Sequence, residues 1–247
     1  MTIFVYGSSS NVFSKINIYL EAFDSVVALK HDFDLCSMPG EVDTFFNSII
    51  IFNGVVTDDV TSLTMLEEFH LNLAERLSAL NKIKIILISS SAVYGDYKSN
   101  FSEIDHCQPI RSYGTSKLVT EGIYRKFIGS NLIIFRLGNF IGLDSVGLKH
   151  NRSKNQLIQI KCRENGSTPL RSYVDEFVLS NAIKNCVKRT GDLPDVLNVA
   201  RFVPQSMSDA AEELGMHFEL KLCYLESLKD ITLMTAKLEN LLIGERK

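Results

Sequence analysis

The chain has 247 residues, of which 45% are hydrophobic and 22% charged, and its formal net charge is −3. This length fits one α/β domain with a large core, with or without a small additional lobe. The slightly negative charge and the lack of a basic block argue against broad binding to nucleic-acid phosphates.

The five cysteines are scattered and show no CxxC spacing, so we expect reduced thiols and no metal site. No apolar run approaches the roughly 20 residues of a membrane span. The first apolar run, Ile3–Tyr6, has no basic segment before it, as a signal peptide would require. We therefore expect a cytoplasmic protein without membrane contact.

Short apolar runs alternate with longer segments of helical periodicity, which is typical of βαβ units and of a doubly wound parallel sheet. The runs are almost continuously hydrophobic, as in parallel strands covered on both faces. The predicted strands are Thr2–Tyr6, Ser25–Leu29, Ser48–Phe52, Lys84–Ile88 and Asn131–Phe135. The predicted helices are Asn11–Ala22, Thr61–Leu80, Tyr113–Ile128, Ser153–Arg163, Asp175–Lys188, Ser206–Leu214 and Lys229–Leu242.

The first predicted strand is followed by Gly7, Ser8, Ser9, Ser10, Asn11 and Val12. Dinucleotide-binding folds place glycines in this turn, so that the backbone can approach a pyrophosphate at a helix N-terminus. Only the first glycine is present, and Phe13 stands where a glycine normally allows close helix–strand packing. The alternative is an ordinary turn with a helix cap.

Hydroxyl groups gather where the strand Lys84–Ile88 ends, at Ser89, Ser90 and Ser91, although a Ser-rich turn would look the same. Tyr113 and Lys117 follow at i and i+4, a spacing that places both on one helix face. A nearby ammonium should lower the pKa of the tyrosine from about 10.

A second copy of the Tyr-x3-Lys spacing, Tyr94 and Lys98, lies in the turn after the serine strand. We favour Tyr113, because it begins a long helical pattern beyond the strand whose end carries the hydroxyls.

These features together resemble the extended short-chain dehydrogenases/reductases of the NAD-dependent epimerase/dehydratase family, whose active site joins a Ser or Thr after the fourth strand to a Tyr-x3-Lys helix. Smaller matches follow in the family's order and cover nearly the whole chain. They are Phe52-Asn53-Gly54, Asn72, the Arg136-x-x-Asn139-x-x-Gly142 segment, and Arg171-Ser172-Tyr173-Val174-Asp175.

The resemblance implies an α/β Rossmann-like fold, with an NAD(P)-binding domain over residues 1–142 and a small substrate-binding lobe over residues 143–247, interleaved with the last sheet elements. It implies that Ser90, Tyr113 and Lys117 are catalytic. It implies substrate contacts at Ser90, Ser91, Asn139 and Arg171. The implied cofactor contacts are Gly7, Ser8, Ser9, Ser10, Asn11, Val12, Lys30, His31, Asn53, Gly54, Asn72, Tyr113 and Lys117.

The expected function is NADPH-dependent reduction of a nucleotide-linked 4-keto-(6-deoxy)hexose, with hydride from the nicotinamide and Tyr113 as general acid. Related 4,6-dehydratases carry an acidic pair after the catalytic hydroxyl residue. Here Ser91 and Ala92 occupy those positions, so dehydration is not expected.

Lys30 stands where NAD-binding relatives carry an acidic residue, which favours NADPH, although a solvated lysine is the alternative and NAD stays possible. A UDP-hexose 4-epimerase with retained NAD is the second candidate, and a non-catalytic cofactor-binding regulator the third. The resemblance also suggests a homodimer through the helices Thr61–Leu80 and Tyr113–Ile128. For Arg171 the alternative to substrate diphosphate binding is a surface ion pair with Asp175.

Overall fold

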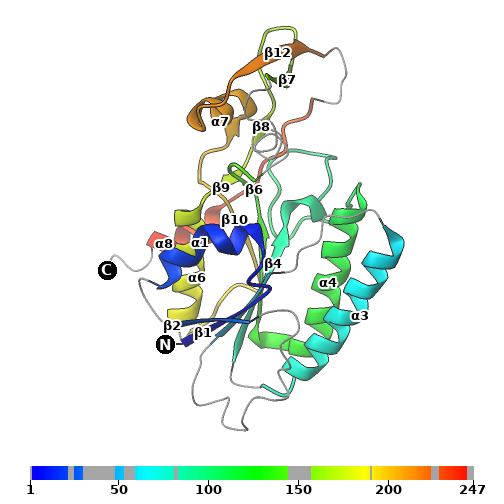
Figure 1. The fold of residues 1–247 in the computed structure, drawn as a ribbon, viewed down its shortest axis with the longest axis vertical. Coiled ribbons are helices and arrows are strands. Elements are labelled where there is room, and N and C mark those ends of the chain that lie inside the picture. Colours follow the sequence, from blue (N-terminus) through cyan, green and yellow to red (C-terminus); the bar gives the residue numbers. More distant parts are fainter. Residues whose placement is uncertain are drawn as a thin grey trace.

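The computed structural model describes residues 2–21, 25–29, 48–52, 59–80, 83–143, 157–189, 191–223 and 228–243. At its centre is a six-stranded sheet in the order β10-β5-β4-β3-β1-β2, in which every neighbouring pair is parallel (Figure 1). Its strands are β1 (Thr2–Tyr6), β2 (Ser25–Leu29), β3 (Ser48–Phe52), β4 (Lys84–Ser90), β5 (Leu132–Leu137) and β10 (Val196–Val199).

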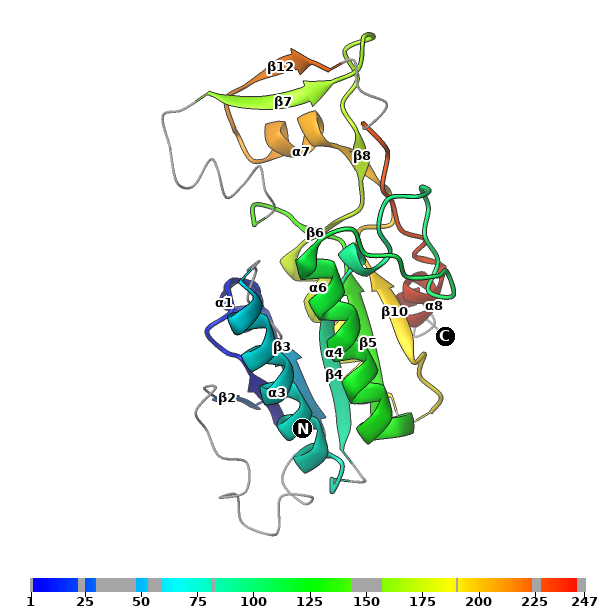
Figure 2. The ribbon, with the colours of Figure 1, turned by 90° about the vertical axis from the view of Figure 1, so that its right-hand side faces the viewer.

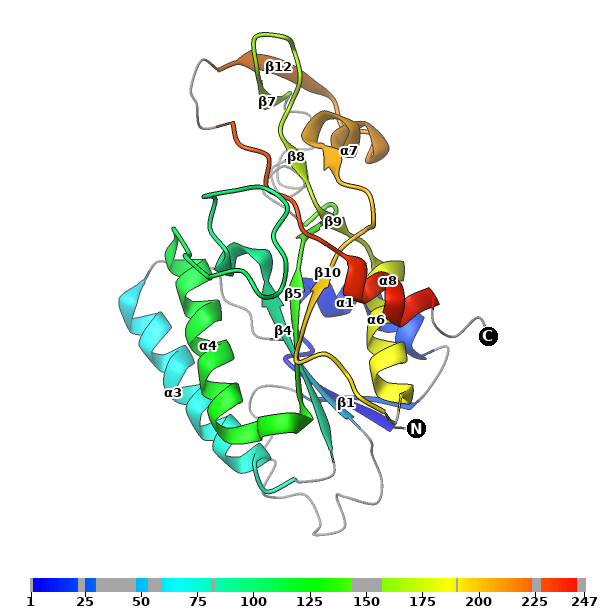
Figure 3. The same cartoon turned by 180° about the vertical axis from the view of Figure 1, so that it is seen from behind.

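Helices cover both faces of this sheet (Figures 2 and 3). On one face α3 (Val60–Leu77) and α4 (Ser112–Ile128) lie side by side, and on the other lie α1 (Asn11–Glu21), α6 (Glu176–Lys188) and α8 (Ala236–Ile243). Successive residues of β1 serve opposite layers: Ile3 and Val5 pack with α1 and α6, and Phe4 and Tyr6 with α3 and α4. This two-sided burial explains why the strands are continuously apolar. The predicted doubly wound Rossmann-like class is confirmed.

All five predicted sheet strands are present, and β4 and β5 extend two residues beyond the predicted ends. The edge strand β10 was not predicted, because its four residues, Val-Leu-Asn-Val, are too short a run to stand out. The helices at residues 11–21, 60–77, 112–128, 176–188 and 207–213 agree with the prediction to within a few residues.

A small lobe lies beyond the carboxyl ends of the strands (Figure 2). It contains β7 (Ile158–Cys162) paired with β12 (Phe218–Leu222), the short strands β8 (Leu170–Arg171) and β11 (Gln205–Ser206), and α7 (Met207–Glu213). The prediction of a helix at Ser153–Arg163 is wrong for its described part, which is strand β7. Alternate residues of β7 are buried, the period-2 pattern of a half-buried strand.

Residues 228–235 link the lobe to the sheet and form no helix. The prediction of a helix over Lys229–Leu242 is therefore wrong for its first part, and the helix α8 begins only at Ala236. The segment runs extended beside the loop after β4 (Figure 3). The Ile231 amide donates to the Leu170 carbonyl at 3.1 Å, and Phe101 exchanges backbone bonds with Thr232 and Met234, each at 2.8 Å. These distant partners take the backbone groups that a helix would have paired internally. We call residues 228–235 the C-terminal strap.

The chain after residue 142 contributes to both parts of the molecule. Elements α6, β10 and α8 complete the layers around the sheet, and the segments between them build the lobe. Among the described helices, none combines the length and hydrophobicity that a membrane crossing requires. The four cysteines in the described part of the chain are free thiols.

Candidate active site

The turn after β1 brings the start of α1 against the end of β3. Gly7 has a φ of +80°, and a Cβ built on it would lie 2.4 Å from the Phe52 carbonyl oxygen, so a side chain is excluded here. Ser10 accepts a bond from the Phe13 amide through its hydroxyl at 3.0 Å and thereby caps α1. Phe13 itself is buried against Phe52, with ring centroids 5.7 Å apart. The missing glycine is thus replaced by an aromatic contact in the core.

This turn lies at the switch point of the sheet, between β1 and β3: β2 is added on one side of β1, and the chain then crosses over to add β3 on the other side. Ligands of doubly wound sheets bind at such a switch point, next to helix N-termini. The close approach at Gly7, the amides of the first turn of α1 and the hydroxyls of residues 8–10 fit a bound diphosphate.

Ser90 ends β4 and caps the short 3-10 turn Ser91–Val93, its hydroxyl accepting from the Ala92 amide at 3.2 Å. The Ser90 hydroxyl lies close enough to the Tyr113 hydroxyl to favour its phenolate form. Gly114 makes this approach of α4 possible, because a Cβ there would lie 2.5 Å from the Ala92 carbonyl oxygen. The serine at the strand end and the tyrosine at the helix start therefore meet, 23 residues apart in the chain.

Lys117 lies one turn further along α4 and is buried, with 5% of its surface exposed. Its Nζ is 5.6 Å from the centre of the Tyr113 ring and donates to the Ile88 carbonyl at 3.4 Å. Burial lowers the pKa of Lys117 to about 7, although the charge of Glu121 counteracts part of this effect.

Burial raises the pKa of Tyr113 above its ordinary value, and the nearby Ser90 hydroxyl offsets only part of the rise. The predicted lowering of this pKa by Lys117 is therefore wrong for the protein without ligands. Desolvation of the phenolate outweighs the effect of Ser90. Tyr113 is consequently a protonated phenol at neutral pH, which is the form of a proton donor.

A cavity of about 320 Å³ opens in front of these residues, between the sheet and the lobe. It brings together Ser90, Ser91, Tyr113, Asn139 and Arg171, which the sequence had marked, and adds Ala92, Gly95, Arg111, Ser172, Ile231 and Leu233, which it had not. Ile231 and Leu233 belong to the C-terminal strap, and no local pattern predicts where such an extended segment lies. Arg111 directly precedes α4, and its proximity to Tyr113 in the chain could have marked it.

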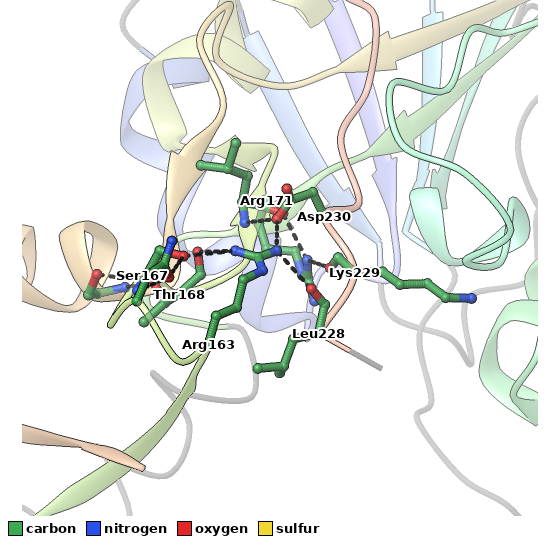
Figure 4. A network of polar contacts seen from close by, with 10 residues as sticks. Arg163, Ser167, Thr168, Arg171, Leu228, Lys229 and Asp230 are labelled. Atoms are coloured by element: carbon green, nitrogen blue, oxygen red, sulfur yellow. Dashed lines mark hydrogen bonds and ion pairs between the residues drawn. The ribbon is translucent and has the colours of Figure 1, made fainter. Parts of the chain in front are cut away.

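Arg171 lies in a network of polar contacts at the junction of lobe and strap (Figure 4). Its Nη1 donates to the carbonyls of Leu170 and Lys229, at 2.8 and 2.7 Å. Asp175 is not its partner: Asp175 caps α6 and forms an ion pair with Arg201 at 2.7 Å. The alternative of an Arg171–Asp175 ion pair is thus wrong, because β9 (Tyr173–Val174) separates the two residues and runs into α6.

The second Tyr-x3-Lys copy does not line the cavity. Tyr94 is fully buried, donates its hydroxyl proton to Asn198 at 2.8 Å, and stacks on Phe101. Lys98 forms an ion pair with Asp105 at 2.7 Å.

Other predicted cofactor contacts are not joined to this cavity. Asn72 is exposed in the second half of α3 and does not line it. Lys30, His31, Asn53 and Gly54 lie outside the described residues. Within the part of the chain that is described, no cluster of three or more His, Cys, Asp or Glu side chains could hold a metal ion.

Residues 59–171 match the model of the NAD dependent epimerase/dehydratase family. No curated protein matches the sequence. Among solved structures, a UDP-glucuronic acid 4-epimerase from Bacillus cereus in complex with NAD is 16% identical, with a TM-score of 0.76 over 100% of this chain and 94% of that one.

A dTDP-4-dehydrorhamnose reductase from Clostridium acetobutylicum is 16% identical, with a TM-score of 0.73 over 100% of this chain and 94% of that one. The protein RMD from Pseudomonas aeruginosa, complexed with NADPH, is 18% identical, with a TM-score of 0.71 over 97% and 91%. At these identities the likeness concerns the fold. The match over residues 59–171, together with this fold, confirms the resemblance to the NAD-dependent epimerase/dehydratase family of extended short-chain dehydrogenases/reductases that the motifs indicated.

Proposed function

We propose that this chain is an NADPH-dependent reductase of a nucleotide-linked 4-keto-6-deoxyhexose. The observation that supports this most is that Ser90, Tyr113, Asn139 and Arg171 line one and the same cavity. Two of these residues carry hydroxyl groups that can contact a carbonyl oxygen. The other two carry an amide and a guanidinium, which are donors of the kind that a diphosphate requires.

When NADPH is bound, its nicotinamide supplies a hydride to the keto carbon. Tyr113 donates its phenolic proton to the keto oxygen, and its raised pKa keeps that proton in place at neutral pH. Ser90 donates a hydrogen bond to the same oxygen and stabilises the charge that develops there. Lys117 would hold the ribose of a bound cofactor, and its ammonium form would stabilise the phenolate that Tyr113 leaves behind.

The cofactor diphosphate would lie at the turn of Gly7–Val12, at the N-terminus of α1. NADPH rather than NADH is proposed because Lys30 can attract a 2′-phosphate. The NADPH complex of the similar RMD protein supports the choice. The nucleotide-sugar class of the substrate is supported by the names of the epimerase and the reductase with the same fold.

Asn139 and Arg171 are proposed to bind the substrate diphosphate from opposite sides. Asn139 begins β6 (Asn139–Phe140), at the carboxyl edge of the sheet, and Arg171 comes from the lobe. Replacement of Arg171 by alanine should weaken substrate binding by roughly 1.5–3 kcal/mol, the range for charged hydrogen bonds. NADPH affinity should hardly change. A variant that loses thermal stability but keeps its KM would show that Arg171 only holds the C-terminal strap.

The decisive experiment is a panel of nucleotide-linked keto-sugars with NADPH, followed by absorbance and by mass spectrometry of the product. A reductase consumes one NADPH for each product molecule. The second candidate is a UDP-hexose 4-epimerase, favoured by the family match and the similar epimerase structure. Interconversion of UDP-hexoses without added reductant would establish that candidate and refute the reductase.

A further inference from the structure

A buried ion pair, Glu121 with Arg136, lies next to Lys117 on the side away from Tyr113 along α4. Glu121 is one helical turn after Lys117 on α4, and only 1% of its surface is exposed. Its carboxylate accepts from Arg136 Nη2 at 2.7 Å and from Arg136 Nε at 3.1 Å, a two-bond contact between planar groups. Arg136 is 4% exposed.

The same carboxylate connects α4 and β4, which carry the catalytic candidates, to the neighbouring strand β5. Ser89, the neighbour of Ser90 on β4, donates its hydroxyl proton to Glu121 at 2.7 Å. Arg136 lies on β5, three residues before Asn139, and is paired in register with Ser89. Glu121 thereby ties α4 to β4 and β5 close to the cavity.

Arg136 is itself held from its other side. Its guanidinium carbon lies 4.8 Å from the centre of the Tyr94 ring, and its Nη1 donates to the Glu103 carbonyl at 3.4 Å. Burial by itself would lower the pKa of Arg136, but its bonds to Glu121 raise it above the ordinary value. Arg136 therefore stays positively charged across the working pH range, and its two bonds to Glu121 fix the position of that carboxylate.

Glu121 also affects Lys117 through its charge. Among the described residues, it is the group whose charge opposes the fall in the pKa of Lys117 on burial. The other titratable or charged groups packed around the pair and Lys117 are Tyr94, Glu103, Asp105, Cys107, Tyr113 and Arg125.

We propose that Glu121 is a positioning residue of the reaction: with Ser89 and Arg136 it fixes the helix of Tyr113 and Lys117 against the strand of Ser90, and its negative charge favours the ammonium form of Lys117. The proposal rests on the proposed function for the role of Lys117 in turnover. The part of the proposal that concerns the charge of the buried Lys117 can be tested without any reaction.

The first measurement follows the ionisation of Lys117 in the whole protein without substrate. Lysine side chains are labelled with ¹³C, the Lys117 signal is identified by its loss in Lys117→Met, and its NMR shift is followed against pH. In Glu121→Gln the midpoint should fall by about one pH unit or more, the effect of removing an opposite charge nearby. Glu121→Asp, which keeps the charge, should restore most of the shift.

The second measurement is the pH profile of NADPH-dependent reduction. Glu121→Gln should reduce kcat about ten-fold at pH 8, which is above both midpoints, because the protonated fraction of Lys117 falls there in proportion to the shift; at pH 5.5 the loss should be less than about two-fold. KM for the sugar should stay within about two-fold. A loss of kcat that is equal at both pH values would assign Glu121 a purely structural role.

Glu121→Gln leaves Arg136 as an unpaired buried cation and can therefore fail to fold. The double variant Glu121→Gln/Arg136→Met removes both charges; its Lys117 midpoint should still fall, but by less than in Glu121→Gln, because the loss of the Arg136 cation acts in the opposite direction. As a matched control, Asp175→Asn weakens the ion pair with Arg201 outside the cavity. It should leave the Lys117 midpoint where it is.

An unchanged Lys117 midpoint in both the single and the double variant would overturn the proposal, whatever the activity. A lowered midpoint in a protein that reduces no keto-sugar would support the influence of Glu121 on Lys117 and refute the proposed function. The two failures are therefore distinguishable.

Discussion

The chain contains the spacing Tyr-x3-Lys twice within 24 residues, and the two copies have different surroundings. Tyr113 and Lys117 lie on α4, share one helix face and meet Ser90 at the cavity. Tyr94 and Lys98 lie in the loop after β4, where the tyrosine enters the core and the lysine pairs with Asp105.

The comparison shows that this spacing brings the two side chains together on the helix. In the loop, the same spacing sends the two side chains to different partners. Burial raises the pKa of Tyr94 to about 12, and Arg136 offsets only part of this rise. Tyr94 nevertheless contributes to the site indirectly, because its ring holds Arg136, the partner of Glu121.

The largest effect is expected from Tyr113→Phe, which removes the proton donor and keeps the ring. Turnover with NADPH should fall by at least the ~10²-fold typical of general acid catalysis. NADPH affinity, measured by fluorescence titration, should stay nearly the same. If Tyr94→Phe were the inactivating change instead, the proton donor would belong to the other Tyr-x3-Lys pair and the assignment of Tyr113 would be wrong.

Lys117→Met should change the pH dependence of stability. The pKa of Lys117 is about 7 in the folded protein and close to the ordinary lysine value of 10.5 when unfolded. Between these values the unfolded chain binds more protons, so raising the pH through this window stabilises the fold. From pH 7 to 9 the wild type should gain about 2 kcal/mol relative to Lys117→Met in urea unfolding. The matched control, Lys98→Met, keeps Lys117 and should keep this gain.

Tyr94→Phe should act on stability and hardly on turnover. It removes the hydroxyl that bonds Asn198 and leaves a buried amide oxygen without that donor. The free energy of unfolding should fall by about 1–2 kcal/mol. Urea unfolding measures this loss, and kcat should stay within a few-fold of the wild type. A loss of turnover near that of Tyr113→Phe would remove the distinction between the two copies.

The smallest effect is expected from Lys98→Met at neutral pH, because the ion pair with Asp105 lies near the surface. Bonds from Lys98 and then Ser102 lower the pKa of Asp105 from 3.8 to about 2. The stability that this carboxylate contributes is present above pH 4 and is lost as the pH falls toward 2. Acid unfolding of Lys98→Met should therefore show a shallower slope in that window. An unchanged slope would mean that Ser102 alone accounts for the shift.

Much of the sheet could be predicted from the sequence, because central parallel strands are buried on both faces and must be apolar throughout. Helix α4 could also be predicted, because its pattern depends on neighbours in the chain. Gly7 could be predicted because the turn after β1 requires one close backbone approach. The failures have a common cause. In β7 the alternation of Ile158, Ile160 and Cys162 was present, but the strand depends on pairing with β12, about 60 residues away.

Only the tertiary structure decided which polar side chains meet. Asp175 lies four residues from Arg171, yet it pairs with Arg201. Glu121 on helix α4 binds the guanidinium of Arg136 from strand β5, and the strap reaches Phe101 from the far end of the chain. Local periodicity determines which face of an element is buried. The partner of a buried charge is set by which elements pack together, and that choice is made by the whole chain at once.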